Sequence, residues 1–572
     1  MQGVFVRRQL LAVLVAALVL PGAVAASENG PTTADRSGEL RSEGPLEFAP
    51  EGQSVDRFEV VTQPEDVYVS ASDGLALHAR LFRPDTSSEP DLKLPVILTH
   101  SPYYEGSALG GNDRSIDIVE FFTPKGYAVA LTDARGTGGS GGCAEQDGLK
   151  QADDFKVLVE HFAALAWSNG KVGSYGKSYD AETQNAGGVL SPNGLATMVT
   201  VAGISGLYDV AFYDGVPLGA NGLASAAIYL PYTVPTAPPG DPFAVKTYEC
   251  QPENFLGPAN ATGDMTQYWQ DREFRLRVND MAESISVLHV HGLGDPTVTP
   301  IAIDGWYDFV PGFTRAIWGQ WGHKYPYDAP ANLSRDDWYQ SIHAWFDFFL
   351  LDLDTEVDAW PPVQVQDDLG VWRGVNSFSE MGTDTRLALG SDLALGGATS
   401  DAATVTVGED SPTQWSTAPF AQDTHLTGRA VLDLVLTLDR PDAHFALVLE
   451  EVSETGAIRK LTDGWLSAMH RNGLESGELV PVGAQVLYRL RSYPFDAVLS
   501  AGSSLRMRLS GNEGSGLSAQ TLWTGEVLTN GESFLTVQIE DAPCGLAVTS
   551  TQEAFGFTPG CPDGIPTRPE QA

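Results

Sequence analysis

The sequence predicts an α/β domain followed by a separate all-β domain. A helical face at 151–166 lies between strand-like runs at 127–132 and 171–177, and such a strand–helix–strand unit is typical of a sheet with parallel strands. Helical periodicity stops at Pro361-Pro362, and several later runs alternate with period two. These three observations place an α/β domain at 58–355 and a second, all-β domain after it.

The first domain opens with strands. Residues 67–70 and 75–82 alternate around a Ser-Asp-Gly turn as a hairpin does, and 95–99 is a compact apolar run typical of a buried strand. Between about 209 and 279 the rhythm of strands and helices fails in a stretch rich in Pro, Gly, Tyr and Ala. We interpret this stretch as an inserted cap.

The second domain, at 361–565, is predicted to be an antiparallel β-sandwich. Residues 432–438 and 505–509 alternate with period two, residues 445–449 are continuously apolar, and turn residues separate these runs. A carbohydrate-binding role is an alternative for this domain, but the sequence offers no aromatic strip that favours it.

The segment 1–25 is predicted to be a signal peptide. Arg7 and Arg8 precede an unbroken apolar run at 10–20, and Ala23-Val24-Ala25 offers a small-residue cleavage site. The apolar run is too short to span a hydrocarbon core of about 30 Å, so we expect no permanent membrane anchor after its removal. The mature chain is then secreted by a route that the segment leaves open, and 26–57 is expected to be a flexible lead-in.

The formal net charge is −40, from 34 basic and 74 acidic residues. Such a surface repels a phosphate backbone, and no basic run interrupts it, so the sequence excludes nucleic acid as a partner. Self-repulsion of this size is tolerated best where salt screens it, since the Debye length falls to about 3 Å at 1 M salt. A saline habitat and an ordinary secreted acidic protein explain the charge equally well.

The four cysteines are expected to form two disulfides. Their number is even, the chain is expected to be exported, and they lack the C-x-x-C spacing of a zinc site. A local bridge from Cys544 to Cys561 is the simplest arrangement, and it leaves Cys143 to pair with Cys250.

Ser178 is the candidate nucleophile. It follows a strand-like run and Gly176, and a helix-compatible run comes after it. A serine hydroxyl needs a base to take its proton, and a strained strand-to-helix turn exposes it to that base. Asp180 stands where the common Gly-x-Ser-x-Gly motif has its second glycine, so the motif alone is weak.

Asp295 and His323 are the candidate acid and base. Asp295 follows an apolar strand-like run that ends at Gly292, and His323 follows a second one that ends in Trp321-Gly322. In an α/β domain of this kind, a catalytic serine, its acid and its histidine are expected in that order along the chain. Taken separately, Asp295 also suits a turn and His323 also suits a core.

Together these motifs resemble the Xaa-Pro dipeptidyl-peptidase and cocaine-esterase group of serine α/β-hydrolases. That group writes its nucleophile turn Gly-x-Ser-Tyr-x-Gly, which matches here except that Ala181 replaces the last glycine. The resemblance extends from about Val67 to about Ser550. It is carried by the following motifs in the group's order: Asp133-Ala134-Arg135-Gly136-Thr137-Gly138-Gly139-Ser140, Trp167-Ser168-Asn169-Gly170-Lys171-Val172-Gly173, Gly176-Lys177-Ser178-Tyr179, His291-Gly292-Leu293-Gly294-Asp295 and Trp321-Gly322-His323.

The resemblance implies further site residues and domains. It places the hydroxyl of Tyr103 and the backbone N–H of Tyr179 in an oxyanion hole, although by itself Tyr103 also suits a loop aromatic at a sheet edge. It implies that the cap is helical and that the last domain is a jelly roll. Tyr208, Tyr213 and Trp269 are then candidate pocket residues of the cap, with core packing as the alternative for each.

The expected function is secreted hydrolysis without a metal or an organic cofactor. The first choice is an Xaa-Pro dipeptidyl-peptidase that forms an acyl-enzyme on Ser178, because the turn at Ser178 and residues 204–209 look closest to secreted peptidases. The alternatives are a carboxylic-ester hydrolase, an acylase of amino-acid esters or β-lactams, and an inactive secreted binding protein. The substrate is then a peptide or an ester, and the sequence leaves the oligomeric state open.

Overall fold

The structure is a computed structural model of the 572-residue chain. It describes residues 53–103, 115–218, 262–301, 303, 306–378, 381–397, 403–409, 412–511, 522–529 and 531–540. The expected signal peptide and the cysteines Cys250, Cys544 and Cys561 lie outside these ranges.

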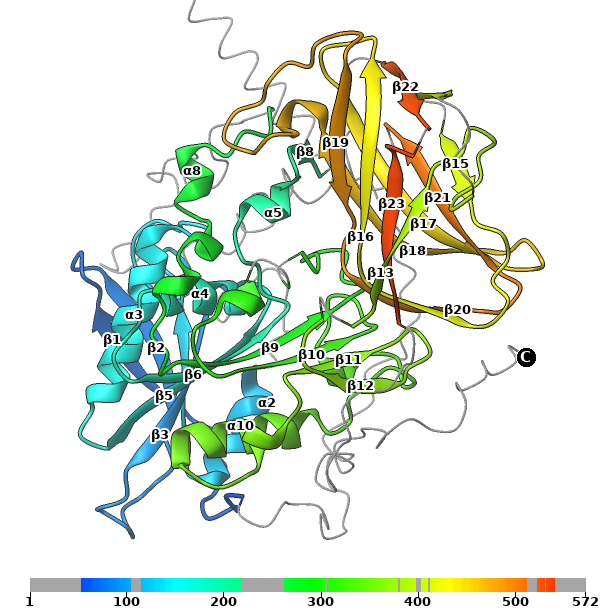
Figure 1. The fold of residues 1–572 in the computed structure, drawn as a ribbon. Coiled ribbons are helices and arrows are strands. Elements are labelled where there is room, and N and C mark those ends of the chain that lie inside the picture. The colour runs from blue at the N-terminus through cyan, green and yellow to red at the C-terminus, as the bar shows by residue number, and fades with distance from the viewer. Residues whose placement is uncertain are drawn as a thin grey trace, which may run out of the picture. The chain divides into compact units, whose positions relative to one another are not determined.

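A ten-stranded sheet forms the first domain (Figure 1). Every neighbouring pair from β4 to β11 is parallel, whereas β1, β2 and β12 join through antiparallel pairings. In spatial order the strands are β1 (Glu65–Ser70), β2 (Ala76–Phe82), β4 (Ala128–Asp133), β3 (Leu94–Ser101), β5 (Ser168–Lys177), β6 (Leu195–Val201), β9 (Ser286–Gly292), β10 (Thr314–Gly319), β11 (Val363–Gln366) and β12 (Trp372–Val375).

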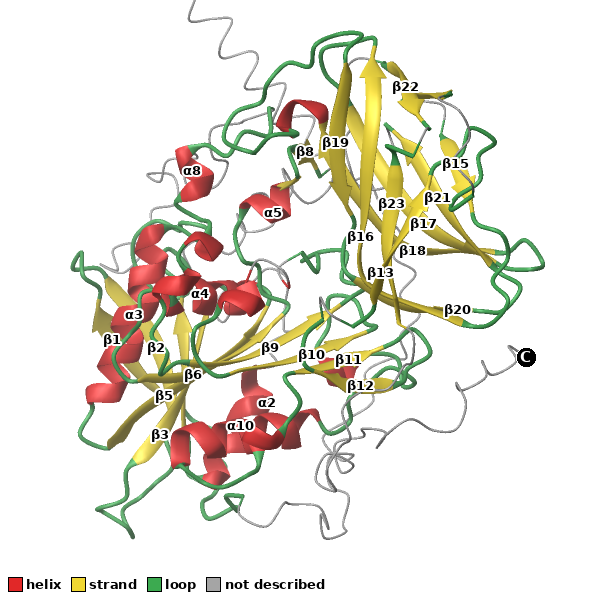
Figure 2. Ribbon diagram, viewed as in Figure 1, coloured by secondary structure: helices red, strands yellow, loops and turns green. Residues whose placement is uncertain are grey.

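Helices cover both faces of this sheet (Figure 2). On one face α3 (Leu149–Ala164) and α4 (Tyr179–Gly188) share a buried cluster with the strands, and on the other α2 (Ser115–Phe122) and α10 (Trp338–Leu351) share a second cluster. Helices on both faces are what a parallel sheet requires, because both of its faces are apolar. The predicted α/β domain is therefore confirmed.

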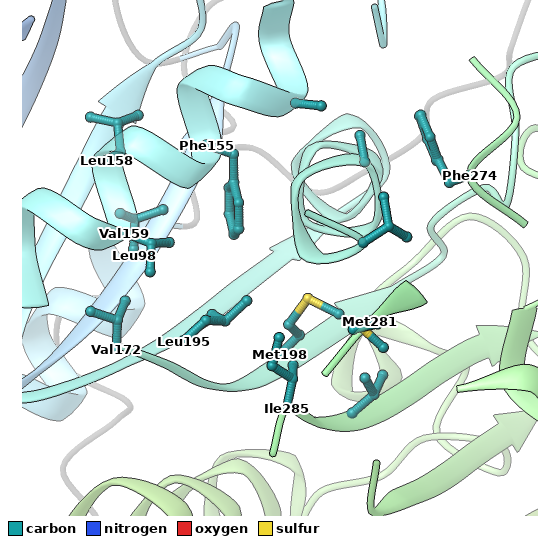
Figure 3. Packing of buried hydrophobic residues seen from close by; sticks show 14 of the residues in the cluster. Leu98, Phe155, Leu158, Val159, Val172, Leu195, Met198, Phe274, Met281 and Ile285 are labelled. Atoms are coloured by element: carbon teal, nitrogen blue, oxygen red, sulfur yellow. The ribbon is translucent and has the colours of Figure 1, made fainter. Parts of the chain in front are cut away.

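The first cluster places large apolar side chains between helix and sheet (Figure 3). Phe155, Leu158 and Val159 of α3 pack over strand residues such as Val172 and Met198, and all five are fully buried. Burial contributes roughly 1.5–3 kcal/mol for each side chain of this size. Ala186 of α4 belongs to the same cluster, so the packing also holds the helix that begins at Tyr179.

The second domain consists of antiparallel strands in two sheets. One buried cluster draws leucines from β16 and β17, which belong to different sheets, so the two sheets pack face to face as predicted. The larger sheet contains β13 (Thr383–Ala388), β14 (Thr404–Gly408), β16 (Thr424–Leu438), β19 (Gln485–Arg491), β20 (Phe495–Leu499), β22 (Thr524–Leu528) and β23 (Phe534–Glu540). The smaller sheet contains β15 (Thr413–Ser416), β17 (His444–Val452), β18 (Ile458–Ser467) and β21 (Ser504–Ser510).

Only the two ends of the predicted cap are described, because residues 219–261 lie outside the described ranges. Those ends contain α5 (Tyr208–Ala211), β7 (Phe212–Tyr213), β8 (Val216–Pro217) and α8 (Gln267–Gln270). The described 3₁₀ turns of the chain are Thr123–Lys125, Phe274–Leu276, Val278–Asp280, Tyr307–Phe309, Pro326–Asp328, Val357–Ala359 and Ala468–His470. No helix within the described ranges is long and apolar enough to cross a membrane.

The end of the predicted flexible lead-in differs from expectation. Ser54 donates its backbone N–H to Asp347 of α10 at 2.6 Å and its hydroxyl to the same carboxylate at 2.8 Å. The carboxylate of Asp347 is buried, so it needs such donors, and it also accepts a bond from the hydroxyl of Tyr127. The described residues at the end of the lead-in are thus bound to α10, which low apolar content did not predict.

Candidate active site

Ser178 occupies a strained turn between β5 and α4. Its φ of 62° and ψ of −128° lie outside the regions that side chains other than glycine favour, which costs on the order of 1–3 kcal/mol. Hydrogen bonds hold this geometry: the Ser178 N–H donates to Val201 O at 2.9 Å, and the N–H groups of Ala181 and Glu182 donate to Ser178 O at 2.8 and 2.9 Å. The serine is presented at the carboxyl end of a central strand.

Close packing around the turn explains its small residues. A Cβ on Gly176 would lie 2.4 Å from the Cβ of Asp180, so only glycine fits there. Ala181 replaces the last glycine of the Gly-x-Ser-Tyr-x-Gly motif, and its methyl group fits because the residue opposite it is a glycine. It faces Gly203, where an added Cβ would lie 2.8 Å from the Cβ of Ala181.

The structure brings Ser178, His323 and Asp295 together. Nε2 of His323 lies 3.0 Å from Oγ of Ser178, and Nδ1 of His323 lies 2.8 Å from Oδ2 of Asp295. The acid follows β9 and the histidine follows β10, and these neighbours are parallel, so their carboxyl ends meet at one edge of the sheet. The arrangement is the geometry of a serine nucleophile, a base and an orienting acid.

Asp295 is buried and bonded on both of its oxygens. Its Oδ1 accepts the backbone N–H groups of Thr297 and Val298 at 2.8 and 3.0 Å, while Oδ2 faces His323. These two bonds fix the orientation of the carboxylate, and its Oδ2 favours a proton on Nδ1 of His323. Nε2 is then left to accept the hydroxyl proton of Ser178.

Two further histidines lie behind the site but have structural roles. The ring of His289 accepts a bond from the indole N–H of Trp318 at 3.0 Å, and Nε2 of His291 donates to Val298 O at 2.9 Å. Burial lowers the pKa of His289 to about 3 and also lowers the pKa of His291. Both rings are therefore neutral at physiological pH. They are buried side chains of β9, the strand that leads to Asp295.

Tyr103 and Tyr179 lie next to each other. Their rings meet edge to face with centroids 6.2 Å apart, and the hydroxyl of Tyr179 donates to Oε1 of Gln151 at 2.9 Å. Tyr179 is the first residue of α4, where backbone N–H groups have no acceptor within the helix. That position suits the N–H donor which the family resemblance implies for Tyr179.

A buried acid pair behind the turn was missed in the sequence. Burial raises the pKa of Asp147 to about 7, and burial together with Asp147 raises the pKa of Glu182. Glu182 lies one helical turn after Ser178, and Gln151 accepts both the backbone N–H of Asp147 and the hydroxyl of Tyr179. An acidic residue one turn into the helix was the available signal, but it is also common at helix starts.

A cavity of about 560 Å³ lies beside the described cap residues. The first lining residues in the chain belong to the segment that follows β6. The last residue of β6, Val201, accepts the backbone N–H of Ser178. Charged side chains of both signs dominate its lining, and two of its arginines belong to the β domain. The lining residues are Tyr208, Asp209, Asp214, Met265, Gln270, Glu273, Arg275, Leu276, Ile301, Arg429, Leu474, Glu475 and Arg491.

Arg275 organises the acids of this cavity. It contacts Asp209 through both terminal nitrogens, at 2.9 and 3.2 Å, and Glu273 through Nε at 2.8 Å. Burial nevertheless raises the pKa of Glu273 to about 8, against the opposing effect of Arg275. Burial also raises the pKa of Asp214, whose carboxylate lies 3.7 Å from the guanidinium of Arg491.

The three candidate pocket aromatics differ in whether they line this cavity. Tyr208 lines the cavity, while Tyr213 and Trp269 do not belong to its described lining. Trp269 packs edge to face on Tyr208 in the core, and Tyr213 donates its hydroxyl to Arg491 O at 2.7 Å. Core packing, the alternative weighed from the sequence, describes Tyr213 and Trp269.

Cys143 is disulfide-bonded in the structure. Its partner and the other cysteines lie outside the described residues, so the expected pairing stays a prediction. Within the described ranges no group of three or more His, Cys, Asp or Glu side chains is arranged to hold a metal ion.

Comparisons with known proteins show which family the chain resembles. A family profile described as X-Pro dipeptidyl-peptidase (S15 family) matches residues 73–325, and one described as X-Pro dipeptidyl-peptidase C-terminal non-catalytic domain matches 355–534. A Streptomyces avermitilis protein with the provisional name Xaa-Pro dipeptidyl-peptidase is 28% identical over 67% of this chain and 62% of its own length. The alignment thus spans less than two thirds of that relative. A Bacillus cereus protein with the same provisional name is 24% identical over 74% of this chain and 80% of its own length.

Solved structures share the fold. A CocE/NonD family hydrolase from Staphylococcus aureus superposes with a TM-score of 0.69 at 18% identity, covering 84% of this chain and 97% of that one. An aminopeptidase from a marine sediment Thaumarchaeota archaeon gives a TM-score of 0.67 at 15% identity, covering 88% of this chain and all of that one. The family profiles and the relatives lead to one conclusion: both domains of the chain match the Xaa-Pro dipeptidyl-peptidase (S15) family of serine hydrolases, and the solved structures share the α/β-hydrolase fold.

Proposed function

We propose that the chain is an Xaa-Pro dipeptidyl-peptidase that releases amino-terminal dipeptides through an acyl-enzyme on Ser178. The observation that carries the proposal is the hydrogen-bonded series Ser178–His323–Asp295 at the nucleophile turn. The match of both domains to family profiles described by this activity supports the choice of substrate.

In the proposed mechanism His323 first acts as a base. Its Nε2 takes the hydroxyl proton of Ser178 as Oγ attacks the scissile carbonyl, and Asp295 stabilises the imidazolium that forms. The carbonyl oxygen becomes an oxyanion that accepts bonds from the Tyr179 N–H and the Tyr103 hydroxyl. Collapse of this intermediate breaks the C–N bond, and His323 returns the proton to the leaving amine.

Water then releases the dipeptide. His323 takes a proton from the water as its oxygen attacks the acyl carbon, and it returns that proton to Oγ of Ser178 when the ester bond breaks. The same sequence hydrolyses an ester when the leaving group is an alcohol. The triad alone therefore does not separate a peptidase from the carboxylic-ester hydrolase or acylase alternatives.

Recognition of a free amino terminus separates these activities. A dipeptidyl-peptidase must pair the substrate ammonium two residues from the scissile bond, and we propose that carboxylates of the charged cavity do so. The acids Asp209 and Glu273 support this role because each already binds a partly buried cation, Arg275. The apolar part of the lining, such as Tyr208 and Ile301, suits a proline ring.

A nucleophile test comes first. Wild-type protein should react with a fluorophosphonate probe, and Ser178→Ala should stay folded but lose labelling and hydrolysis by several orders of magnitude. Ser88→Ala, at an exposed serine, is the matched control and should keep both. Full labelling of folded Ser178→Ala would remove Ser178 from the mechanism and point to another nucleophile, whereas wild-type protein that does not react with the probe would favour an inactive binding protein.

A substrate test then decides the class. Ala-Pro and Gly-Pro anilides should be cleaved, and acetylation of their amino terminus should remove most of kcat/KM because a buried charge of the enzyme loses its partner. Equal rates on free and acetylated anilides, or rapid aryl-ester hydrolysis without anilide cleavage, would assign the chain to the ester hydrolases instead.

We further propose that the protein is exported and that 1–25 is removed. The arginine pair, the apolar run and the small residues of this segment support the proposal. Sequencing the amino terminus of protein recovered outside the cell should show a start near Ala26. Protein that stays inside the cell with Met1 or its neighbours intact would contradict it.

A further inference from the structure

The loop that carries His323 is fastened to the loop that carries Asp295. The N–H of Leu293 donates to Gly319 O at 2.8 Å, and the N–H of Gly294 donates to Trp321 O at 3.2 Å. A Cβ on Gly292 would lie 2.2 Å from Trp321 O, so the two backbones touch. This contact sets the acid and the histidine relative to each other.

Gln320 fastens the opposite side of the same loop. Its side-chain nitrogen Nε2 donates to the backbone oxygen of Gln366 in β11 at 2.9 Å and to the backbone oxygen of Asp496 in β20 of the β domain at 3.0 Å. Its backbone N–H donates to Oε1 of Gln366 at 3.1 Å. Both hydrogens of the side-chain amide are therefore used to hold the loop just before His323.

Asp496 is itself held by buried charges. Its carboxylate accepts bonds from Nη2 of Arg373 at 2.7 Å, Nε2 of His425 at 2.7 Å and Oγ1 of Thr427 at 2.8 Å. Burial alone lowers the pKa of His425, but Asp496 and Glu540 outweigh burial and raise it to about 9. The ring is thus cationic at neutral pH, and the backbone carbonyl of Asp496 is a fixed acceptor for Gln320.

We propose that Gln320 is a positioning residue for His323 and that the backbone of Asp496 makes the β domain a support of the catalytic site. The inference rests on the proposed role of His323 as the base, and it holds for a peptide or an ester substrate. Gln320 acts on the placement of the imidazole near Ser178. Displacement of a reacting group by about 1 Å can cost on the order of 10²-fold in rate. The expected signature is a lower kcat at a nearly constant KM.

Gln320→Leu tests this inference, because leucine has a similar size but donates no hydrogen bond. On an aryl ester, kcat should fall by roughly 10- to 100-fold while KM stays within about twofold. The rate of fluorophosphonate labelling should fall by a similar factor. Gln485→Leu, at an exposed position of β19, is the matched control and should leave all three values unchanged.

Gln320→Asn keeps the test decisive if the leucine variant does not fold. The shorter side chain keeps its amide but reaches one of the two carbonyls, so kcat should lie between wild type and Gln320→Leu. Circular dichroism and the thermal midpoint identify the folded variants. Wild-type kcat in a folded Gln320 variant overturns the inference, as does a loss carried by KM alone.

The failure of the proposed nucleophile gives a different result. If Ser178→Ala keeps labelling, the role of Ser178 is wrong whatever the Gln320 variants do. If Ser178→Ala loses labelling while the Gln320 variants keep wild-type kcat, the proposed function stands and the positioning role falls.

Discussion

Oδ2 of Asp295 lies 2.8 Å from Nδ1 of His323, and the other oxygen of the same carboxylate is bonded to two backbone N–H groups. The acid is therefore fixed before it orients the imidazole. The loop contact between Gly294 and Trp321 adds a second constraint on the same pair. Orientation of His323 is thus built into the backbone of two neighbouring loops.

Asp295→Asn should lower kcat strongly, by about 10⁴-fold if the variant behaves as it does in the best-studied triad. The amide favours the wrong imidazole tautomer, so Nε2 no longer accepts the proton of Ser178. Steady-state kinetics on an aryl ester measures the loss. Glu283→Gln, at an exposed acid near the start of β9, should retain activity. The opposite pattern would move the orienting role away from Asp295.

Tyr103→Phe tests the oxyanion hole. The variant keeps the ring that packs on Tyr179 and removes only the hydroxyl, so the fold should be unchanged. Loss of one oxyanion donor should reduce kcat by roughly 10²- to 10³-fold with little change in KM. Tyr68→Phe, at a half-exposed tyrosine, serves as the control. Wild-type kcat in Tyr103→Phe would leave the second donor to be found elsewhere.

Gly203→Ala should destabilise the turn at Ser178, and Ala181→Gly should restore part of the loss. An added Cβ at Gly203 would lie 2.8 Å from the Cβ of Ala181 but also 3.1 Å from Nδ2 of Asn185, so relief is incomplete. Denaturant midpoints of the two single variants and the double variant give the coupling between the sites. Gly397→Ala, at an exposed glycine, is the control. Additive effects would contradict this packing argument.

Asp147→Asn should make the stability of the protein less sensitive to alkaline pH. The pKa of Asp147 is raised by burial to about 7 in the fold, so the stability linked to its protonated form is complete below about 3.8 and is lost as the pH rises through 7. Asparagine keeps a neutral side chain at every pH. Relative to wild type, the urea midpoint of the variant should therefore be higher at pH 8.5 than at pH 5.

Two controls sharpen this measurement. Asp91→Asn, at an exposed acid, should shift the midpoint equally at both pH values. Arg272 and Glu145 act on Asp147, and Asp180 acts on Glu182, so these groups must stay in place. A difference between Asp147→Asn and wild type that is larger at pH 5 would reverse the assigned direction of the shift.

Sequence patterns were sufficient for the fold class, and together with the family resemblance they named three residues that the structure brings together. Parallel strands with helices between them bring their carboxyl ends to one edge, so a serine, an acid and a histidine placed after three strands meet in space. The order of Ser178, Asp295 and His323 along the chain already carried that information. The same holds for the second domain, because period-two alternation reports one buried face for each strand.

Only the tertiary structure decided the contacts between residues that are remote in sequence. Gln320 and Asp496 are 176 positions apart, and nothing near Gln320 in the chain indicates that its amide reaches the β domain. In the sequence nothing distinguishes Asp147 and Glu182 from other acids, and only their burial in the fold raises their pKa values. Ser54 lies in a segment whose composition predicts flexibility, but in the fold it is bound to Asp347. Periodicity reports which face of an element is buried, whereas a hydrogen bond depends on which elements the whole chain places side by side.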